Sequence, residues 1–442
     1  MKTISVGKLT YDTSSRAGII NITDASGGNS TLNIDFETIL PFINLINKEV
    51  LDFFIISATV YGIDRFVERK KNSVDGWSRE LKVNFPVHNP AKWNACKQGM
   101  NGLLSFLTGD YWNVEFRKQT FDVPKATLDK EYTVPFEQVN LLSGGLDSLI
   151  GALDFLKQEP KQKVLFVSHY DRQMRGPKGD QQDLIAEIEK MYPKQFAYIP
   201  SVRVSLDRTN VSRETTFRSR SLLFLGIALI AAQATNTQSI IVPENGTVSL
   251  NFPLSPSRRS SCSTRTTHPF VLDNVLSIWK ILSITTDIRN PYEFQTKGEM
   301  VNDCKEQTNL FKLIAMANSC GKRGHVKDWT NRSATHCGVC MPCIYRQAAL
   351  LKLEDKTDYG DLINNLFPSK EQSKKSQDSG AMLDFLHRQI TKEEIKQELI
   401  VNGVKNLSKL NRYVDVVWRT RRELKQWVKK VGNSTIKLKA GV

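Results

Sequence analysis

The chain has 442 residues, of which 61 are Lys or Arg and 46 are Asp or Glu, so its formal net charge is +15 at neutral pH. Hydrophobic residues make up 40% of the sequence, which is typical of a globular protein and excludes a disordered chain. The length predicts two or three domains. No apolar stretch follows a basic start, and the longest apolar run is about half as long as a membrane-spanning helix. We therefore expect neither a secretory signal nor a membrane span, and the cysteines should be reduced thiols or metal ligands.

Residues 1–130 predict an N-terminal α+β domain. Short apolar runs separated by Gly, Ser, Asn and Asp are typical of strands and turns. The apolar stretch 36–67 indicates both helical and strand segments, which periodicity alone does not separate. Residues 95–107 predict a helix. No spacing of catalytic residues occurs here, so we expect a surface for a partner or a dimer rather than a second active site. The predicted strands are 2–6, 18–22, 77–85 and 112–116.

Residues 131–353 alternate between short β-rich runs and helical segments of ten or more residues. This alternation predicts an α/β domain in which helices cover both faces of a doubly wound parallel sheet. Ligands of such sheets bind at the carboxyl ends of the strands. The predicted strands are 139–142, 163–168, 197–204 and 239–242, and the predicted helices are 149–156, 181–191, 216–234 and 345–353.

Residues 354–442 predict a small, basic, helical C-terminal region. Residues 368–380 are all polar residues, Pro or Gly and indicate a loop. Residues 392–407 and 414–431 have helical periodicity. Residues 401–442 contain eleven Lys or Arg and two acids. This charge is consistent with a solvated helix, with an acidic protein partner or with nucleic acid. We favour the first two because no nucleic-acid-binding motif accompanies the charge.

A glycine-containing turn, Ser143-Gly144-Gly145-Leu146-Asp147-Ser148, lies between a predicted strand and a predicted helix. Adjacent glycines let the backbone bend tightly and approach a ligand closely. Backbone N–H groups and two serine hydroxyls then converge at a helix N-terminus, which favours a phosphate or pyrophosphate. No Gly-Lys-Ser or Gly-Lys-Thr closes the turn, so it is not a Walker A loop. The alternative is an ordinary glycine turn capped by Asp147 and Ser148.

Four cysteines have spacing typical of a metal site. Cys320 precedes Cys337, Cys340 and Cys343, which form two overlapping Cys-x-x-Cys steps. Four thiolates in a tetrahedral array are typical of structural zinc. An iron–sulfur cluster uses the same ligands, and a histidine, His325 or His336, could replace one sulfur. We favour zinc over both, and over disulfides, which are typical of small secreted domains.

The order of the two features carries a resemblance to a known family. The turn resembles the PP-loop, SGGxDS, of the ATP pyrophosphatases. Together with the cysteines, with residues 220–226 (RSLLFLG) and with residues 296–301 (TKGEMV), it resembles the 7-cyano-7-deazaguanine synthase family, QueC. The resemblance covers roughly residues 138–350.

Two departures from the QueC pattern are specific to this chain. Ser221 stands where the family has Asn, and the family's Tyr-Pro-Asp-Cys-Arg block is missing. Residues 243–246 (PENG), 251–254 (NFPL) and 263–269 (STRTTHP) replace that block. This pattern, with the added terminal regions, resembles the QueC-like proteins of bacterial anti-phage defence systems.

The resemblance implies roles for individual residues. ATP is expected to bind the turn and the neighbouring strand ends, and Mg²⁺ is expected to bridge its phosphates with help from Asp147. Asp171 is a further candidate for the ATP pocket. The composition of the polar loop with Arg258, Arg259 and Arg265 suits an anionic or purine-like ligand and equally a solvated loop. The alternatives for the other candidates are a packing role for His169, surface salt bridges for Arg220 and Lys297, and a solvated turn for Glu244 and Asn245. The catalytic residues are expected to be Ser143, Asp147, Ser148 and Lys297; the ATP-binding residues Leu142, Ser143, Gly144, Gly145, Leu146, Asp147, Ser148, Ser168, His169 and Arg220; and the substrate-binding residues Glu244, Asn245 and Arg265.

The resemblance also implies a reaction. A cytoplasmic ligase would adenylate a 7-deazaguanine carboxylate, release pyrophosphate, and transfer the acyl group to an amine, which in the defence-associated relatives is expected on a partner protein. The alternatives are a 7-cyano-7-deazaguanine synthase that uses ammonia in queuosine-precursor synthesis, a PP-loop enzyme that modifies tRNA, and a non-catalytic nucleotide sensor. The intact turn argues against the sensor.

Overall fold

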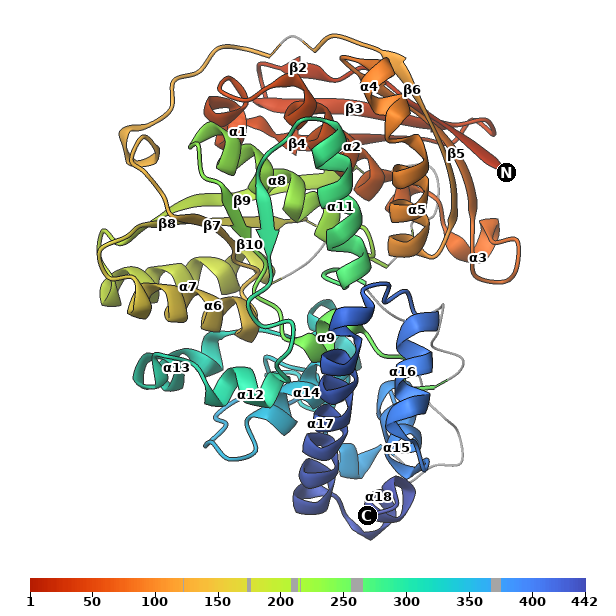
Figure 1. Cartoon of the computed structure of the whole chain (residues 1–442), viewed down its shortest axis with the longest axis vertical. Coiled ribbons are helices and arrows are strands. Elements are labelled where there is room, and N and C mark those ends of the chain that lie inside the picture. Colours follow the sequence, from red (N-terminus) through yellow and green to blue (C-terminus); the bar gives the residue numbers. More distant parts are fainter. Residues whose placement is uncertain (122, 173–175, 208–213, 215, 256–264, 367–374) are drawn as a thin grey trace.

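The computed structural model describes residues 1–121, 123–172, 176–207, 214, 216–255, 265–366 and 375–442. It is a mixed α/β structure built on one large, mostly parallel sheet (Figure 1). Among the described residues the sheet has 11 strands in the order β11-β10-β7-β8-β9-β4-β3-β1-β5-β6, and β2 pairs with β3. The strands are β1 (Lys2–Val6), β2 (Thr10–Asp12), β3 (Ala17–Asp24), β4 (Asn29–Asp35), β5 (Glu80–Val87), β6 (Tyr111–Lys118), β7 (Gln138–Leu141), β8 (Val164–Tyr170), β9 (Phe196–Leu206), β10 (Ser239–Ile241) and β11 (Asp287–Arg289).

Five neighbouring strands, in the order β9-β8-β7-β10-β11, form the parallel part of the sheet, in the region where the sequence predicted alternating strands and helices. Neighbours in the order β9-β8-β7-β10-β11 are all parallel. Along β8, Leu165 and Val167 join one core and Val164 and Phe166 join another. Helices α8 (Arg220–Ala234) and α11 (Pro269–Ile281) pack in the first core, and α6 (Leu146–Gln158) and α7 (Pro177–Met191) in the second. The prediction of a mixed α/β fold with a mostly parallel sheet is confirmed.

The N-terminal region continues this sheet. Strand β4 pairs antiparallel with β9, with Ile34 opposite Val204. Residues 36–67 form helices α1 (Phe36–Ile43) and α2 (Lys48–Phe66), so the strand segments expected there are absent from this described stretch. Helix α2 is buried on all sides because α8 and the sheet surround it, and all-round burial removes the one-sided periodicity that identifies a surface helix. The boundary at residue 130 stays a prediction, since sheet and core both cross it.

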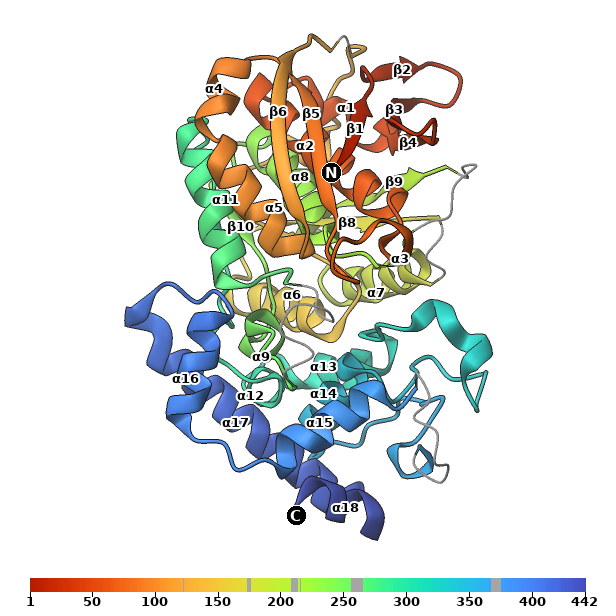
Figure 2. The same cartoon turned by 90° about the vertical axis from the view of Figure 1, so that its right-hand side faces the viewer.

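The two edges of the sheet approach each other through a pair of helices. Helix α5 (Lys97–Thr108) covers β6 and packs against α11, which neighbours β11. Figure 2 shows α5 and α11 side by side. The sheet therefore curves around α2 and α8. Short helices α3 (Arg69–Asn72), α4 (Pro90–Ala95) and η1 (Lys130–Tyr132) complete this half.

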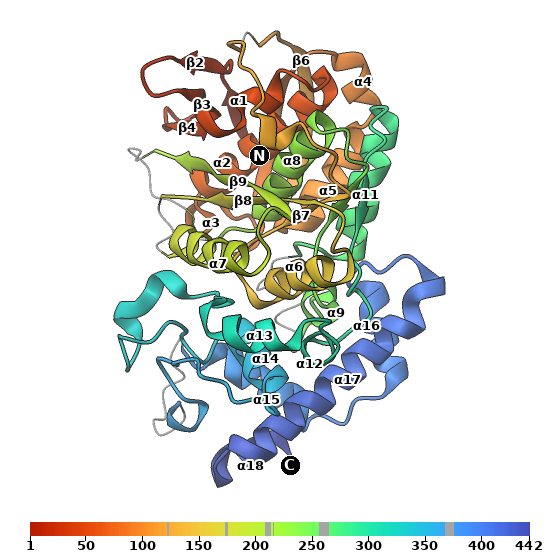
Figure 3. The same cartoon turned by 90° about the vertical axis from the view of Figure 1, so that its left-hand side faces the viewer.

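The other half of the molecule is helical (Figure 3). Helix α17 packs on α9, α14 and α16, and its Arg419 forms an ion pair with Glu299 at 2.5 Å. The predicted C-terminal helices exist, although the first ends at Val401 and the second begins at Leu407. The helices here are α9 (Gly246–Leu250), α12 (Lys297–Asn302), α13 (Gln307–Leu313), η2 (Ile314–Met316), η3 (Arg323–Asp328), α14 (Met341–Ala349), η4 (Ile363–Asn365), α15 (Gln377–His387), α16 (Lys392–Val401), α17 (Leu407–Val431) and α18 (Ser434–Ala440).

Two further expectations concern membrane-spanning helices and the predicted loop at 368–380. None of the helices in the described ranges combines the length and apolar character that crossing a bilayer requires. The predicted loop 368–380 lies largely outside the described residues, and its last part is helical because α15 begins at Gln377.

Candidate anion-binding site and metal centre

A cavity of about 1050 Å³ opens where the strand order of the parallel part changes direction. Numbered along the chain, β9-β8-β7-β10-β11 is the order 3-2-1-4-5, so the switch point lies between β7 and β10. Ligands of open α/β sheets bind at such points, beyond the carboxyl ends of the strands. The loops that follow β7 and β10 both line the cavity, as do the start of α8, the start of α12, residues 318–325 and two side chains of the N-terminal region.

The turn after β7 adopts the conformation that its glycines allow. Gly144 has φ +84°, and a Cβ there would lie 3.2 Å from Cγ of Gln181. Gly145 is the N-cap of α6. The hydroxyls of Ser143 and Ser148 lie 3.2 Å apart, and Ser148 also donates a hydrogen bond to the Gly145 carbonyl at 2.9 Å. Both serines line the cavity.

The N-terminus of α6 retains donors for a ligand. The Leu146 N–H donates to the hydroxyl of Ser319 at 3.2 Å. The N–H groups of Asp147 and Ser148, by contrast, have no acceptor within the described ranges of the chain. The first turn of a helix leaves such donors unsatisfied, and the helix dipole makes this end favourable for an anion. Two free N–H groups and the Ser143 hydroxyl therefore form a donor set at the cavity.

Asp147 holds three elements together behind this turn. One of its carboxylate oxygens accepts a hydrogen bond from Lys297, the first residue of α12, in a buried ion pair. The other accepts from the Asn245 side chain at 2.6 Å. Asn245 is fully buried and also caps α9 by accepting from the Val248 N–H at 3.1 Å. Asn245 is therefore committed to structure, whereas Lys297 brings a positive charge to the cavity.

Glu244 lies at the end of β10 and lines the cavity. Its carboxylate accepts hydrogen bonds from the hydroxyls of Thr266 and Thr267 at 3.1 and 2.8 Å. Loss of hydration, with the nearby negative charge of Asp147, raises the pKa of Glu244 to about 7. Near neutral pH this side chain therefore exists in both protonation states.

The predicted ATP-binding residues divide into two groups. Arg220 lines the cavity at the start of α8. Ser168 and His169 are fully buried and lie behind the turn: Ser168 donates to the Leu142 carbonyl at 2.5 Å, and His169 lies 3.4 Å from the Val204 carbonyl. Burial and the charge of Arg220 lower the pKa of His169 well below its usual value, so His169 is a neutral core residue.

Two further predicted residues, Asp171 and Arg265, do not line the cavity. Asp171 is buried and binds the hydroxyl of Tyr61 at 2.8 Å and the guanidinium of Arg65. Arg265 donates to the Phe106 carbonyl at 3.0 Å and stacks over the Phe106 ring. Arg258, Arg259 and residues 263–264 lie outside the described residues.

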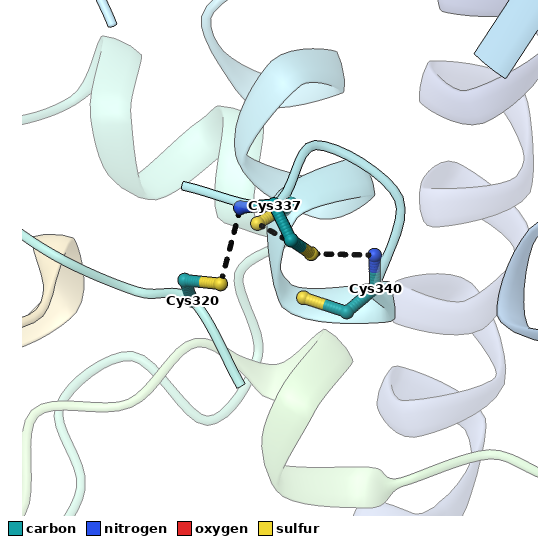
Figure 4. Close-up of side chains that lie close together, drawn as sticks. Cys320, Cys337 and Cys340 are labelled. Carbon is teal, nitrogen blue, oxygen red and sulfur yellow. Dashed lines mark hydrogen bonds between the residues drawn. The ribbon is translucent and has the colours of Figure 1, made fainter. Parts of the chain in front are cut away.

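The four predicted cysteines come together (Figure 4). The Sγ atoms of Cys320, Cys337, Cys340 and Cys343 all lie within 4.8 Å of one another, and those of Cys337 and Cys343 are 3.8 Å apart. A tetrahedron with Zn–S bonds of about 2.3 Å places neighbouring sulfurs about 3.8 Å apart. The cluster can therefore hold a metal such as zinc.

Neighbouring groups fit a thiolate cluster. Backbone N–H groups of Cys337 and Lys322 donate to Sγ of Cys320, each at 3.3 Å, and the Cys340 N–H donates to Sγ of Cys337 at 3.3 Å. Such donors stabilise negative sulfur. His336 accepts from the Ser319 N–H at 3.4 Å through Nε2, and His325 is exposed beside Asp328, so sulfur fills all four positions of the cluster.

The cysteine cluster is joined directly to the anion-binding turn. The residues before Cys320 lie across the turn: the Asn318 N–H donates to the Gly144 carbonyl at 2.8 Å, and Ser319 receives the Leu146 N–H. Arg323 then forms an ion pair with Asp180 of α7 at 2.9 Å. Sequence reasoning missed Asn318, Ser319 and Arg323 because no motif marks them; only their position beside Cys320 could have drawn attention.

Comparisons with known proteins do not assign the chain to a family. No protein-family model matches it, and neither a curated protein nor a solved structure matches it. The function is therefore argued from the geometry of the cavity and from the residues that line it.

Proposed function

We propose that the chain is a PP-loop ATP pyrophosphatase of the QueC-like type, which adenylates a 7-deazaguanine carboxylate and transfers it to an amine. One observation carries this proposal: the free N–H groups of Asp147 and Ser148, with the hydroxyl of Ser143, lie at a large cavity at the sheet's switch point. This donor set suits a pyrophosphate. Lys297 and Arg220 add positive charge to the same cavity.

The proposed reaction has two steps. A carboxylate does not react with an amine at neutral pH because oxide is a poor leaving group. In the first step, a carboxylate oxygen bonds to the α-phosphorus of ATP, the α–β phosphoanhydride bond breaks, and pyrophosphate leaves. In the second step, the amine attacks the acyl adenylate, AMP leaves and the nitrogen gives up a proton. The turn stabilises the charge that develops on pyrophosphate in the first step.

The positions of the other polar residues support definite roles. Lys297 would bind phosphate or the substrate carboxylate, and its ion pair with Asp147 fixes its place. Glu244 is placed to accept hydrogen bonds from the N–H groups of a guanine-like base. Magnesium does not fit on Asp147 as the side chains lie, because Lys297 and Asn245 already occupy both of its oxygens. We therefore derive no step through Mg²⁺.

The cysteine cluster would hold structural zinc. All four positions are sulfur, which leaves no open coordination site for chemistry. The metal would fix the segment 318–320 against the turn and thereby keep the N–H groups of α6 in place. Zinc would thus act on the anion site only through position.

We propose an N-terminal α-amine of a partner protein, in an anti-phage defence system, as the acceptor. The loop after β10 replaces the block that the QueC family has there, and an α-amine with a pKa near 8 is more often unprotonated than a lysine. RNA is less well supported, because the basic helix α17 uses Arg419 and Arg421 in contacts within the chain.

The decisive experiment measures the products of ATP with and without 7-carboxy-7-deazaguanine. We expect pyrophosphate only with the carboxylate, and free AMP only when an amine acceptor is present as well. The Ser143→Ala variant should lose this turnover, whereas Ser26→Ala, at an exposed turn serine, should keep it. ADP and phosphate as the only products would overturn the mechanism. Intact mass spectrometry of a co-expressed partner then tests the acceptor, and a free nitrile base made from ammonia would identify the synthase instead.

A further inference from the structure

One wall of the cavity includes two side chains from outside the region that resembles QueC. Arg65, near the end of α2, and Trp77, before β5, line the same cavity as Ser143 and Asp147. They contact residues just before α8: Arg65 contacts Glu214 and Phe217, and Trp77 contacts Arg218. The helix predicted at 216–234 begins only at Arg220. The N-terminal region therefore contributes side chains to the cavity and is more than a partner surface.

The wall contains three stacks of a guanidinium on an aromatic ring. The guanidinium carbon of Arg218 lies 4.4 Å from the centre of the Trp77 ring, that of Arg65 lies 4.6 Å from the Phe217 ring, and that of Arg220 lies 5.1 Å from the Phe224 ring. All six residues line the cavity. Flat aromatic and guanidinium surfaces of this kind suit a planar ligand.

Polar atoms at the same wall lack partners. Nε1 of Trp77, Oγ1 of Thr216 and Oγ of Ser221 are buried and have no hydrogen-bond partner among the residues that the structure describes. All three residues line the cavity. Buried polar atoms are nearly always satisfied in folded proteins, so three of them beside one cavity point to a bound group that satisfies them.

Buried ion pairs hold this wall in place. Arg79 binds Asp64 and Asp110 at 2.6 Å each, with all three side chains fully buried. Asp64 also accepts a hydrogen bond from the hydroxyl of Ser219, the N-cap of α8, at 3.0 Å. The end of α2, the loop before β5 and the start of α8 are therefore fixed to one another, which preorganises the wall for binding.

The chemistry of the wall indicates its ligand. The Trp77 indole and the guanidinium groups only donate hydrogen bonds, so the ligand must offer acceptors or negative charge. Glu214, the acid of the wall, uses its two oxygens to accept from the N–H groups of Arg69 and Thr216. The α6 N-terminus already provides a separate anion site in the same cavity.

We propose that the wall formed by Trp77, Thr216, Phe217, Arg218, Arg220 and Ser221 is the subsite of the carboxylate substrate, a planar aromatic acid. Its ring stacks at Trp77 and its carboxylate lies at Arg220 and Ser221, while the polyphosphate of ATP occupies the α6 N-terminus. This inference rests on the proposed function and adds Trp77, a residue of the N-terminal region that the resemblance to QueC does not include, to the substrate subsite.

The test measures binding of two ligands separately by calorimetry: 7-carboxy-7-deazaguanine, and ATP without it. Replacing an aromatic side chain on which a base stacks weakens binding of that base by roughly 5- to 150-fold. We expect Trp77→Leu to weaken binding of the carboxylate within this range and to leave ATP affinity within about twofold. Trp77→Phe, which keeps a ring and removes the N–H, should lose less. Trp112→Phe is the matched control, because Trp112 donates to Thr108 at 2.9 Å in the same region but does not line the cavity.

Three results would overturn the inference. The first is a wild-type protein that does not bind the carboxylate, the second is unchanged carboxylate affinity in folded Trp77→Leu, and the third is a parallel loss of ATP affinity, which would place the adenine base at Trp77. Thermal unfolding of each variant establishes that it is folded. The proposed function fails separately: a wild type that binds the carboxylate at Trp77 but forms no AMP and pyrophosphate would keep the subsite and reject the ligase.

Discussion

Lys297 forms a buried ion pair with Asp147, although 150 residues separate them in the sequence. The pair joins the first turn of α6 to the first turn of α12 at the floor of the cavity. Because Thr296 and Glu299 form a capping box at the start of α12, the lysine is held at a fixed point rather than on a mobile chain end. The positive charge and the α6 N-terminus therefore face the cavity together.

Breaking this ion pair should cost stability as well as activity. We expect Asp147→Ala to lower the free energy of unfolding by about 3 kcal/mol, because Lys297 is then left buried without a counter-charge. Asp147→Asn, which keeps a hydrogen-bond acceptor, should lose less. Urea unfolding monitored by circular dichroism measures both. If the double variant Asp147→Ala with Lys297→Met loses as much free energy of unfolding as the two single variants together, the two residues are not coupled.

Glu244 should make stability depend on pH. Its folded pKa of about 7 lies above the ordinary glutamate value, so the folded state favours the protonated form. The stability that Glu244 contributes is therefore complete below about pH 4.5 and is lost as the pH rises through 7. We expect the free energy of unfolding of Glu244→Gln, relative to that of the wild type, to increase by about 2 kcal/mol from pH 5 to pH 8. A stability difference that stays constant over this range would show that Glu244 is ionised throughout.

The cysteine cluster should contain one zinc ion per chain. Elemental analysis of Cys343→Ser should show loss of the metal, together with reduced solubility, because structural zinc contributes directly to folding. Cys96→Ser and Cys304→Ser serve as controls, since both residues are buried away from the cluster; Cys262 lies outside the described residues. Iron in place of zinc would contradict this assignment.

The basic face of α17 should be divided into structural and exposed charges. Arg421 is buried and donates to the Leu386 carbonyl at the end of α15 at 2.9 Å, so Arg421→Gln should destabilise the fold. Arg422, Lys429 and Lys430 are exposed. Replacing these three with Gln should weaken association with an acidic partner protein and leave formation of AMP unchanged, as measured by pull-down and chromatography. A tight tRNA complex that weakens steeply with salt, and that these changes abolish, would instead indicate an RNA substrate.

The sequence predicted elements whose signals are local. The turn at Ser143, the helix that follows it and the four cysteines each have a short, recognisable spacing, and the structure places them as expected. Contacts set by tertiary packing could not be read in this way. Trp77 enters the cavity only because buried ion pairs dock its loop on the start of α8, and Ser319 meets the turn only through the fold of the cysteine loop. His169 follows a predicted strand, where a ligand residue would be expected. In the structure it is buried in the core, and the pairing of β8 with β9 shifts register between Val167 and His169.

The pairing of β4 with β9 has a consequence for anyone who shortens this protein. A fragment that starts at residue 131 would expose the edge of β9 at Val204, Ser205 and Leu206, where β4 pairs with it, and the apolar side of α8 that α2 covers. Unprotected edges of this kind recruit strands from other molecules. Residues 131–442 are therefore unlike a module that can be excised and expressed by itself: without the first 130 residues they should aggregate, and supplying those residues as a separate chain should restore solubility by strand complementation.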